Sequence, residues 1–280
     1  MYTFISKEEV LNHLNNEQVR IVDCRFQLGK PEVGQTQYEK SHIPGAVYFH
    51  LEKDLSGVKK EHGGRHPLPE IKDFQKTLES VGISNETTVI AYDGGDEAFA
   101  ARLWWLMKYV GHEKVQILDG GFDKWEEANY PVDEHVPSYT LSNFKVHIQE
   151  NILATVEDVR DAILHRDSTL IDSREQKRYL GIEEPIDKKA GHIPTAINKA
   201  WMHGFENGFF KSPSDQEKRF NELKKDQPII VYCGSGITAT PNYIALQQAG
   251  FKNIKLYAGS FSDWVSYDEH EVEIGEEFPK

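Results

Sequence analysis

A short segment in the second half of the chain surrounds a cysteine with features that make a thiol reactive. Cys233 ends an apolar run and opens the sequence Cys-Gly-Ser-Gly-Ile-Thr, which leads into a helical pattern. The glycines allow backbone conformations that turn successive N–H groups inward, and the helix start adds partial positive charge. A cysteine in such a loop is predicted to be held as a thiolate and to act as a nucleophile. The rest of the predicted loop is Gly234, Ser235, Gly236, Ile237 and Thr238.

The chain contains the same pattern twice, and this repeat predicts the elements that position the loop. Four segments of the first half recur in the second half in the same order, which indicates a tandem duplication. The matching pairs are IVDCRF (21–26) with LIDSRE (170–175), SHIPGAV (41–47) with GHIPTAI (191–197), TVIAYDGG (88–95) with PIIVYCGS (228–235), and VQILDGGFDKW (115–125) with IKLYAGSFSDW (254–264).

Each half alternates short β-branched runs with helical stretches, which predicts an α/β fold. Residues 89–92 and 229–232 are predicted to be buried parallel strands. Residues 74–81 and 243–249 are predicted to be helices, the second closed by Gly250. We expect a mainly parallel sheet flanked by helices on both faces in each of two domains. These are predicted at 1–137 and 154–280, with a linker at 138–153 that lies against one of them.

Features present in both halves are interpreted as structural. Asp23 and Arg25 recur as Asp172 and Arg174, which predicts the same ion pair in each domain. The two His-Ile-Pro turns, at 42–44 and 192–194, predict turn histidines rather than ligands. The tryptophans at 125 and 264 are predicted to be core residues of a final helix. Cys24, whose counterpart is Ser173, is predicted to be a buried, inert thiol.

Features present in one half are the functional candidates. The counterpart of Cys233 is Asp93, so only the second domain has a nucleophile there. The counterpart of Arg178 is Gly29, and a guanidinium at this point could bind a carboxylate or sulfonate through two parallel hydrogen bonds. Lys188 and Lys189 follow and could add positive charge. A solvated surface position remains the alternative for all three cations.

Composition narrows the classes of partner. With 45 acidic and 32 basic residues the net charge is −13, which argues against nucleic acid and membrane surfaces as partners. An anionic substrate would therefore need a local positive pocket. Two cysteines among 280 residues, and an N-terminus without an apolar signal core, predict a cytoplasmic protein with free thiols.

Together, the repeat, the two His-Ile-Pro turns and Cys-Gly-Ser-Gly-Ile-Thr-Ala resemble the two-domain sulfurtransferases of the rhodanese superfamily. The resemblance implies a catalytic second domain and an inactive first copy, with no metal or organic cofactor. It also implies a reaction in two steps. A cysteine takes a sulfane sulfur from thiosulfate or 3-mercaptopyruvate, and the resulting persulfide passes it to cyanide, a thiol or thioredoxin.

The same resemblance suggests the donor and a proton relay. Thiosulfate-preferring members carry cations in the loop, whereas Gly234 and Ser235 are neutral, so 3-mercaptopyruvate is slightly favoured. In the mercaptopyruvate type a serine, a histidine and an acidic residue assist proton transfer, which implies Ser235, His66 and Glu52. The usual acid is Asp rather than Glu. Two further departures are evident: a second substrate arginine, nine residues after the one matched by Arg178, is replaced by Asp187, and the segment is about two residues shorter. Lys188 or Lys189 is the expected substitute, and His66 could instead be a surface histidine without a role.

Two other functions fit parts of the pattern. A persulfide carrier or docking module would need the cysteine loop but no turnover, and the presence of both domains argues against it. A cysteine phosphatase also holds a thiolate in an anion-binding loop, but it needs an arginine six residues after the cysteine. That position is Ala239, and no arginine lies between Cys233 and Lys280.

Overall fold

Each half of the chain starts its first helix at a hydroxyl residue. In the computed structural model, which describes residues 2–276, Ser6 caps α1 (Lys7–His13) and Thr155 caps α6 (Val156–His165). In both caps the hydroxyl accepts the N–H of an acidic residue three positions later, whose carboxylate accepts the N–H of the cap. This reciprocal arrangement satisfies backbone donors that a helix start leaves open. The duplicated sequence therefore begins the same structure twice.

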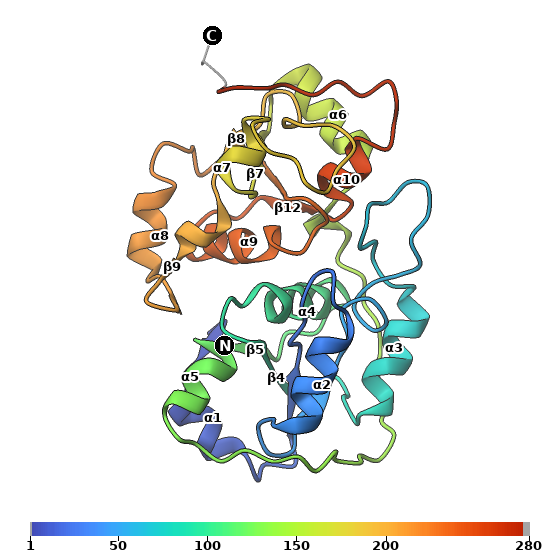
Figure 1. The fold of residues 1–280 in the computed structure, drawn as a ribbon, viewed down its shortest axis with the longest axis vertical. Helices are drawn as coiled ribbons and strands as arrows, with labels where there is room; N and C mark the ends of the chain where they lie inside the picture. The colour runs from blue at the N-terminus through green and yellow to red at the C-terminus, as the bar shows by residue number, and fades with distance from the viewer. Residues whose placement is uncertain (1, 277–280) are drawn as a thin grey trace. The chain divides into compact units, whose positions relative to one another are not determined.

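The first unit consists of the chain up to Gly57, Leu68–Gln149 and Asn207–Phe210 (Figure 1). Its five strands form a parallel sheet in the order β1-β5-β4-β2-β3. The strands are β1 (Phe4–Ile5), β2 (Val19–Asp23), β3 (Val47–Tyr48), β4 (Thr88–Tyr92) and β5 (Val115–Leu118). The remaining helices are α2 (Glu32–Lys40), α3 (Ile71–Ser80), α4 (Ala98–Tyr109) and α5 (Gly121–Glu127).

The second unit consists of Val58–Pro67, Glu150–Glu206 and the chain from Lys211 onward. Its parallel sheet has the equivalent order β6-β12-β11-β7-β8. The strands are β6 (Leu153–Ala154), β7 (Thr169–Asp172), β8 (Ile197–Asn198), β11 (Ile229–Tyr232) and β12 (Ile254–Tyr257). The helices besides α6 are η1 (Glu150–Ile152), α7 (Gln176–Tyr179), η2 (Trp201–Gly204), α8 (Pro213–Arg219), α9 (Ala239–Gln248) and α10 (Ser260–Trp264). Strands β9 (Phe205–Glu206) and β10 (Phe209–Phe210) form a separate pair.

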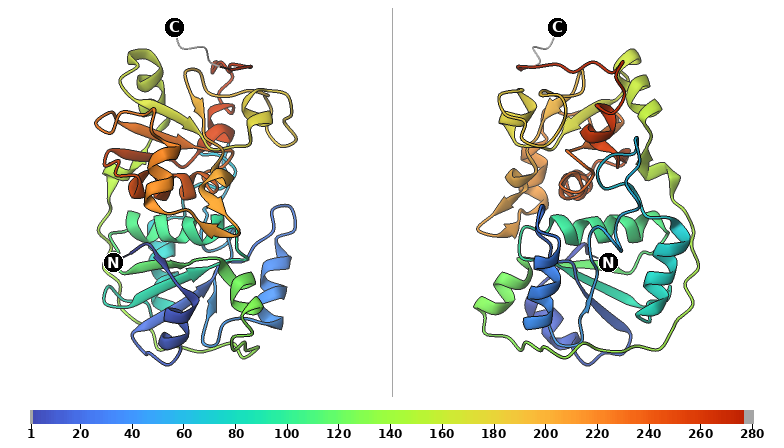
Figure 2. Two further views of the ribbon diagram at one scale, coloured as in Figure 1. Left: turned by 90° about the vertical axis from the view of Figure 1, so that its left-hand side faces the viewer. Right: turned by 45° about the vertical axis from the view of Figure 1, so that its right-hand side comes forward.

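Helices cover both faces of each sheet (Figure 2). In the first unit α1, α2 and α5 supply core residues to one face, and α4 packs against β4 and β5. In the second unit α6 and α10 share a core with one face, and α9 packs against β11 and β12. The predicted α/β class and the two parallel sheets are therefore confirmed.

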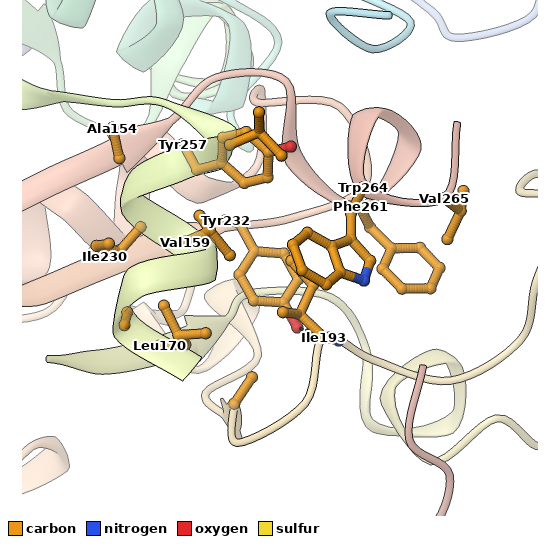
Figure 3. Close-up of a cluster of buried hydrophobic side chains, with 13 residues drawn as sticks. Ala154, Val159, Leu170, Ile193, Ile230, Tyr232, Tyr257, Phe261, Trp264 and Val265 are labelled. Carbon is orange, nitrogen blue, oxygen red and sulfur yellow. Dashed lines mark hydrogen bonds between the residues drawn. The ribbon is translucent and has the colours of Figure 1, made fainter. Parts of the chain in front are cut away.

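The core of the second unit fixes the strand that ends at the cysteine. Tyr232 lies beside Phe261 and Trp264 of α10 in this cluster (Figure 3). All three are at most 3% exposed, and the Tyr232 hydroxyl accepts the N–H of Ile193 at 3.1 Å. Burial of each large side chain is worth about 2–3 kcal/mol. The strand end therefore has little freedom to move.

The predicted strands and helices agree with the structure, apart from their ends. α9 begins at Ala239, four residues before the predicted start. The early start is compatible with Pro241, because a proline in the first turn lacks an N–H that the helix would not use. Gly250, just beyond the helix, has φ +90° and ends it as predicted.

The features shared by both halves have the structural roles predicted for them. Arg25 and Arg174 bind Asp23 and Asp172, each with a closest distance of 2.6 Å between nitrogen and oxygen. His42 and His192 are buried, and each contacts a backbone carbonyl oxygen through Nδ1, at 2.7 and 2.8 Å.

Cys24 is likewise buried, but it lies one residue beyond β2 rather than within a strand. Burial, reinforced by the nearby Asp23, raises the pKa of its thiol well above the ordinary value. This environment fits the predicted inert thiol.

Most of the segment predicted to be a linker, residues 138–149, packs on the first unit, whereas residues 150–153 form η1 and the start of β6 in the second unit. Phe144 is 1% exposed, and the N–H groups of His147 and Gln149 donate to carbonyls at the end of α4. The larger part of the predicted linker therefore lies against the first unit. Within residues 2–276, no helix is both long and apolar enough to cross a bilayer.

Candidate active site

Cys233 lies directly after β11, where the chain turns into α9. It is 1% exposed, and its Sγ accepts the N–H of Gly236 at 3.2 Å. Gly236 has φ +76°, and a Cβ there would lie 2.1 Å from the Ala258 carbonyl oxygen. Only glycine fits both this conformation and this close approach. The loop thus aims a backbone donor at the sulfur through Gly236, whereas Gly234, the other glycine of the prediction, does not have a positive φ.

The corresponding loop of the first unit holds an anion in a similar way. The buried Asp93 carboxylate accepts the N–H groups of Gly95 and Glu97 through Oδ1, and those of Phe99 and Ala100 through Oδ2, at 2.9–3.1 Å. Burial raises the pKa of Asp93 above its ordinary value, and the nearby Asp96 adds to this effect. The duplicated turn therefore directs amides at one acceptor group, a carboxyl group in one copy and sulfur in the other.

Ser260 is a further contact of Cys233 that sequence reasoning missed. Its Oγ accepts the Cys233 N–H at 3.1 Å, lies 3.9 Å from Sγ, and donates to the Tyr257 carbonyl at 2.8 Å. Ser260 has φ +57°, a strained conformation for a residue with a side chain, and its counterpart Gly121 has φ +58°. The signal was available in the repeat, since serine replaces glycine only in the half with the cysteine.

Ser235 and His66 come together as the resemblance implied. Oγ of Ser235 lies 2.8 Å from Nδ1 of His66, and both residues are 7% exposed. His66 belongs to Val58–Pro67, which packs on the second unit through bonds of Gly63 and Arg65 to α10 (Figure 1). His66 is therefore buried rather than on the surface, and its role in the relay stays a prediction.

Glu52 is not part of this unit. It belongs to the first unit, its side chain is exposed, and its N–H donates to Nδ1 of His50 at 3.1 Å. Its role as the third member of the relay stays a prediction. Among the loop residues, Ile237 is buried, and Thr238 precedes the first residue of α9.

Two guanidinium groups lie next to the loop at Gly234. A Cβ on Gly234 would be 2.8 Å from Arg65 Nη2, and 3.4 and 3.6 Å from Nη1 and Nη2 of Arg178. Arg178 is thus placed beside the cysteine, as its lack of a counterpart suggested. Arg65 was missed, although it directly precedes His66.

Acidic side chains bind both guanidinium groups. Arg178 donates to both oxygens of Glu184 at 2.8–3.2 Å and to Oδ2 of Asp187 at 2.9 Å, while Arg65 binds Oδ1 of Asp187. Burial opposes ionisation of Glu184, but bonds from Arg178 and from two backbone N–H groups lower its pKa. Burial raises the pKa of Asp187 despite the two arginines.

The two lysines differ in their surroundings. Lys189 Nζ donates to the carbonyls of Asp268 and His270, at 3.3 and 2.8 Å. Lys188 is exposed and lines a pocket of about 140 Å³ together with Arg65 and Asp187. Lys189 therefore binds the chain beyond α10, whereas Lys188 shares a pocket with Arg65 and Asp187.

Comparison with known proteins agrees with this geometry. The family model described as "Rhodanese-like domain" matches residues 6–128 and again 155–267. A probable 3-mercaptopyruvate sulfurtransferase of Pseudomonas aeruginosa is 35% identical, covering 97% of this chain and 98% of its own. The thiosulfate sulfurtransferase of Rattus norvegicus is 31% identical, covering 92% of this chain and 89% of its own.

A solved structure shows the same fold. The crystal structure of SseA from Escherichia coli, whose description names the rhodanese fold and 3-mercaptopyruvate, aligns with a TM-score of 0.84 at 29% identity. The alignment covers 94% of this chain and 100% of the other. This chain therefore belongs to the rhodanese-like family, whose two-domain sulfurtransferases it matches along nearly its whole length.

Proposed function

We propose that the sulfurtransferase reaction of this chain runs through a persulfide on Cys233, with thiosulfate or 3-mercaptopyruvate as donor and 3-mercaptopyruvate slightly favoured. The acceptor is cyanide or a thiol, including the thiol of a protein such as thioredoxin. The observation that carries the proposal is the Gly236 N–H donating to Sγ in a loop whose twin holds a carboxylate. The second domain is the catalytic one, and the first, with Asp93 at the equivalent position, is inactive.

The proposed chemistry conserves atoms and charge. The Cys233 thiolate attacks the sulfane sulfur of the donor and forms an S–S bond. With thiosulfate the donor S–S bond breaks and sulfite leaves without needing a proton. With 3-mercaptopyruvate the C–S bond breaks, the thiol proton must be removed, and the leaving enolate must gain a proton to become pyruvate. The persulfide then transfers its outer sulfur to the acceptor and regenerates the thiolate.

This difference gives the Ser235–His66 pair a role with only one donor. Their bond of 2.8 Å provides a path for a proton beside the nucleophile. No such transfer is needed when sulfite leaves. A relay that continues to Glu52 is part of the proposal.

The decisive experiment compares kcat/KM for the two donors in wild type and in Ser235→Ala. Wild type should turn over many times with cyanide as acceptor, because the site releases product and reforms the thiolate. Ser235→Ala should lower kcat/KM for 3-mercaptopyruvate by about 100-fold, the usual contribution of acid–base catalysis, and change that for thiosulfate far less.

Two controls separate the alternatives. Glu52→Gln should reproduce the donor-selective loss if the relay reaches Glu52, and full activity would remove Glu52 from it. Labelling of Cys233 by one sulfur without further turnover would favour the persulfide carrier. An equal loss with both donors in Ser235→Ala would refute the proton relay.

Ser260 should have two opposing effects, because its backbone conformation destabilises the fold while its hydroxyl contacts the cysteine. Ser260→Gly removes the strain of φ +57° but also the hydroxyl that contacts the cysteine. Because these effects oppose each other, the free energy of unfolding should change by no more than about 1 kcal/mol. Sulfur transfer should fall by about 10-fold, as expected when a hydrogen bond at the reacting centre is lost.

Steady-state kinetics with a urea titration test this prediction. Gly121→Ser, the reverse change at the equivalent position, serves as the control, and it should lower stability without changing transfer. Wild-type activity in Ser260→Gly would assign Ser260 a purely structural role.

A further inference from the structure

We propose that Arg65 is the second guanidinium that binds the anionic end of the sulfur donor, and that Asp187 is an internal anion which the donor displaces. The proposal rests on the function proposed above and deepens it by identifying donor-binding residues. The donor end concerned is a small group with two or more oxygens, a carboxylate or a sulfonate.

The first support is the position of the two guanidinium groups. Both lie within 3.6 Å of where a Gly234 side chain would begin, one residue from the nucleophile. Gly234 does not have the positive φ that requires glycine elsewhere in this loop. Its lack of a side chain instead leaves space for the two cations. A donor whose sulfur meets Cys233 would have its anionic end close to Arg65 and Arg178.

The second support is that these two cations need an anion between them. Asp187 supplies it, with Oδ1 on Arg65 and Oδ2 on Arg178, and its side chain is 3% exposed. Two guanidinium groups that share one carboxylate have the geometry that recognises planar, two-oxygen anions. Asp187 therefore occupies the kind of position that a donor carboxylate would take.

The third support is access. The side chains of Arg65 and Arg178 are 22% and 17% exposed, so neither is sealed in the core. The pocket of about 140 Å³ reaches Arg65 and Asp187 and is also lined by Lys59 and Lys188. A small anion can approach Arg65 and Asp187 through this pocket, and a donor that takes the place of Asp187 supplies the negative charge that the two guanidinium groups need. Arg178 keeps its bonds to Glu184 during this exchange.

The test uses the full chain with Arg65→Gln, Asp187→Asn and a control, Arg160→Gln. Arg160 lies on the same unit, and its change removes the same charge from a surface pair with Glu269. Two quantities are measured: KM and kcat for each donor, and the protection of Cys233 from iodoacetamide by inorganic sulfate. The second does not depend on turnover. Thermal melts report whether each variant folds.

Arg65→Gln should raise the donor KM by about 10-fold or more with kcat little changed, and weaken sulfate protection to a similar extent, because a charge-assisted contact is lost. Asp187→Asn should change both quantities in the opposite direction: the donor KM should fall, and a lower concentration of sulfate should protect Cys233. Transfer from a preformed persulfide to cyanide should be unchanged in Arg65→Gln, since the donor has already left.

Each contrary result has one meaning. If Arg65→Gln behaves like Arg160→Gln, or if Asp187→Asn folds but leaves sulfate protection unaltered, the arginine–aspartate pair is structural and the inference is wrong. If Asp187→Asn does not fold, the comparison of Arg65→Gln with Arg65→Lys remains the test: both should raise the donor KM, and Lys should raise it less because it keeps the positive charge. If wild type forms no persulfide, the proposed function fails, whereas sulfate protection still tests the anion site.

Discussion

Cys233→Ser should lose sulfur transfer from both donors, by about 1,000-fold or more, the loss seen when a catalytic nucleophile is removed. A serine hydroxyl in the same loop is far less ionised than a thiol and forms no persulfide bond. Wild-type protein incubated with donor alone should gain the mass of one sulfur atom on the peptide that contains Cys233. The variant should gain none. The measurements are steady-state kinetics and mass spectrometry of the peptides.

The second cysteine provides a matched control. Cys24 lies at the equivalent edge of the first sheet, directly after β2, and burial raises the pKa of its thiol. Cys24→Ala should therefore keep full activity and the added sulfur on Cys233, although it leaves a small space in the core. If transfer survived in Cys233→Ser but was lost in Cys24→Ala, the nucleophile would be Cys24 and not Cys233.

The fold was predictable because the chain repeats itself. Each β-branched run that recurs, such as the one ending at Tyr232, became a parallel strand, and the strand orders of the two sheets are equivalent. The repeat also identified structural residues correctly, since Asp23 and Arg25 pair just as Asp172 and Arg174 do. The ends of elements were less predictable, because Pro241 can be tolerated in a first turn as well as break a helix.

The site was predictable where it depends on local sequence. Cys233, Gly236 and the helix start are neighbours in the chain, so their geometry follows from the turn they form. Arg65 and Asp187 are far apart in sequence, and no local pattern indicates that they pair or that Arg65 lies next to Gly234. Ser260 was predictable only in part. The sequence shows that serine replaces the Gly121 of the first half, but it does not show that Ser260 contacts the sulfur.

Two glycine substitutions in the loop should have different effects, because a new Cβ meets backbone at Gly236 and the ends of side chains at Gly234. Gly236→Ala should lower both stability and transfer strongly. A side chain at φ +76° costs about 1–2 kcal/mol. The new Cβ would also lie 2.1 Å from the backbone carbonyl oxygen of Ala258. A flexible side chain could move away from such a contact, but backbone at the end of a strand cannot.

The loop must therefore shift, and the Gly236 N–H would no longer point at Sγ. Loss of this donor should reduce kcat by about 100-fold, as removal of a preorganised donor does at other anionic centres. Iodoacetamide should modify Cys233 more slowly in the variant at neutral pH, because less thiolate is stabilised.

Gly234→Ala is the informative partner for that change. The atoms nearest to its Cβ would be the ends of the Arg65 and Arg178 side chains, which can move aside, so the fold and kcat should be kept while the donor KM rises. Urea titrations and steady-state kinetics on the two variants measure these differences. If Gly236→Ala retained the reactivity of the thiol, the backbone amide would not be what holds the sulfur anion. If Gly234→Ala instead lost kcat at unchanged KM, the guanidinium groups above it would act on the chemical step rather than on the donor.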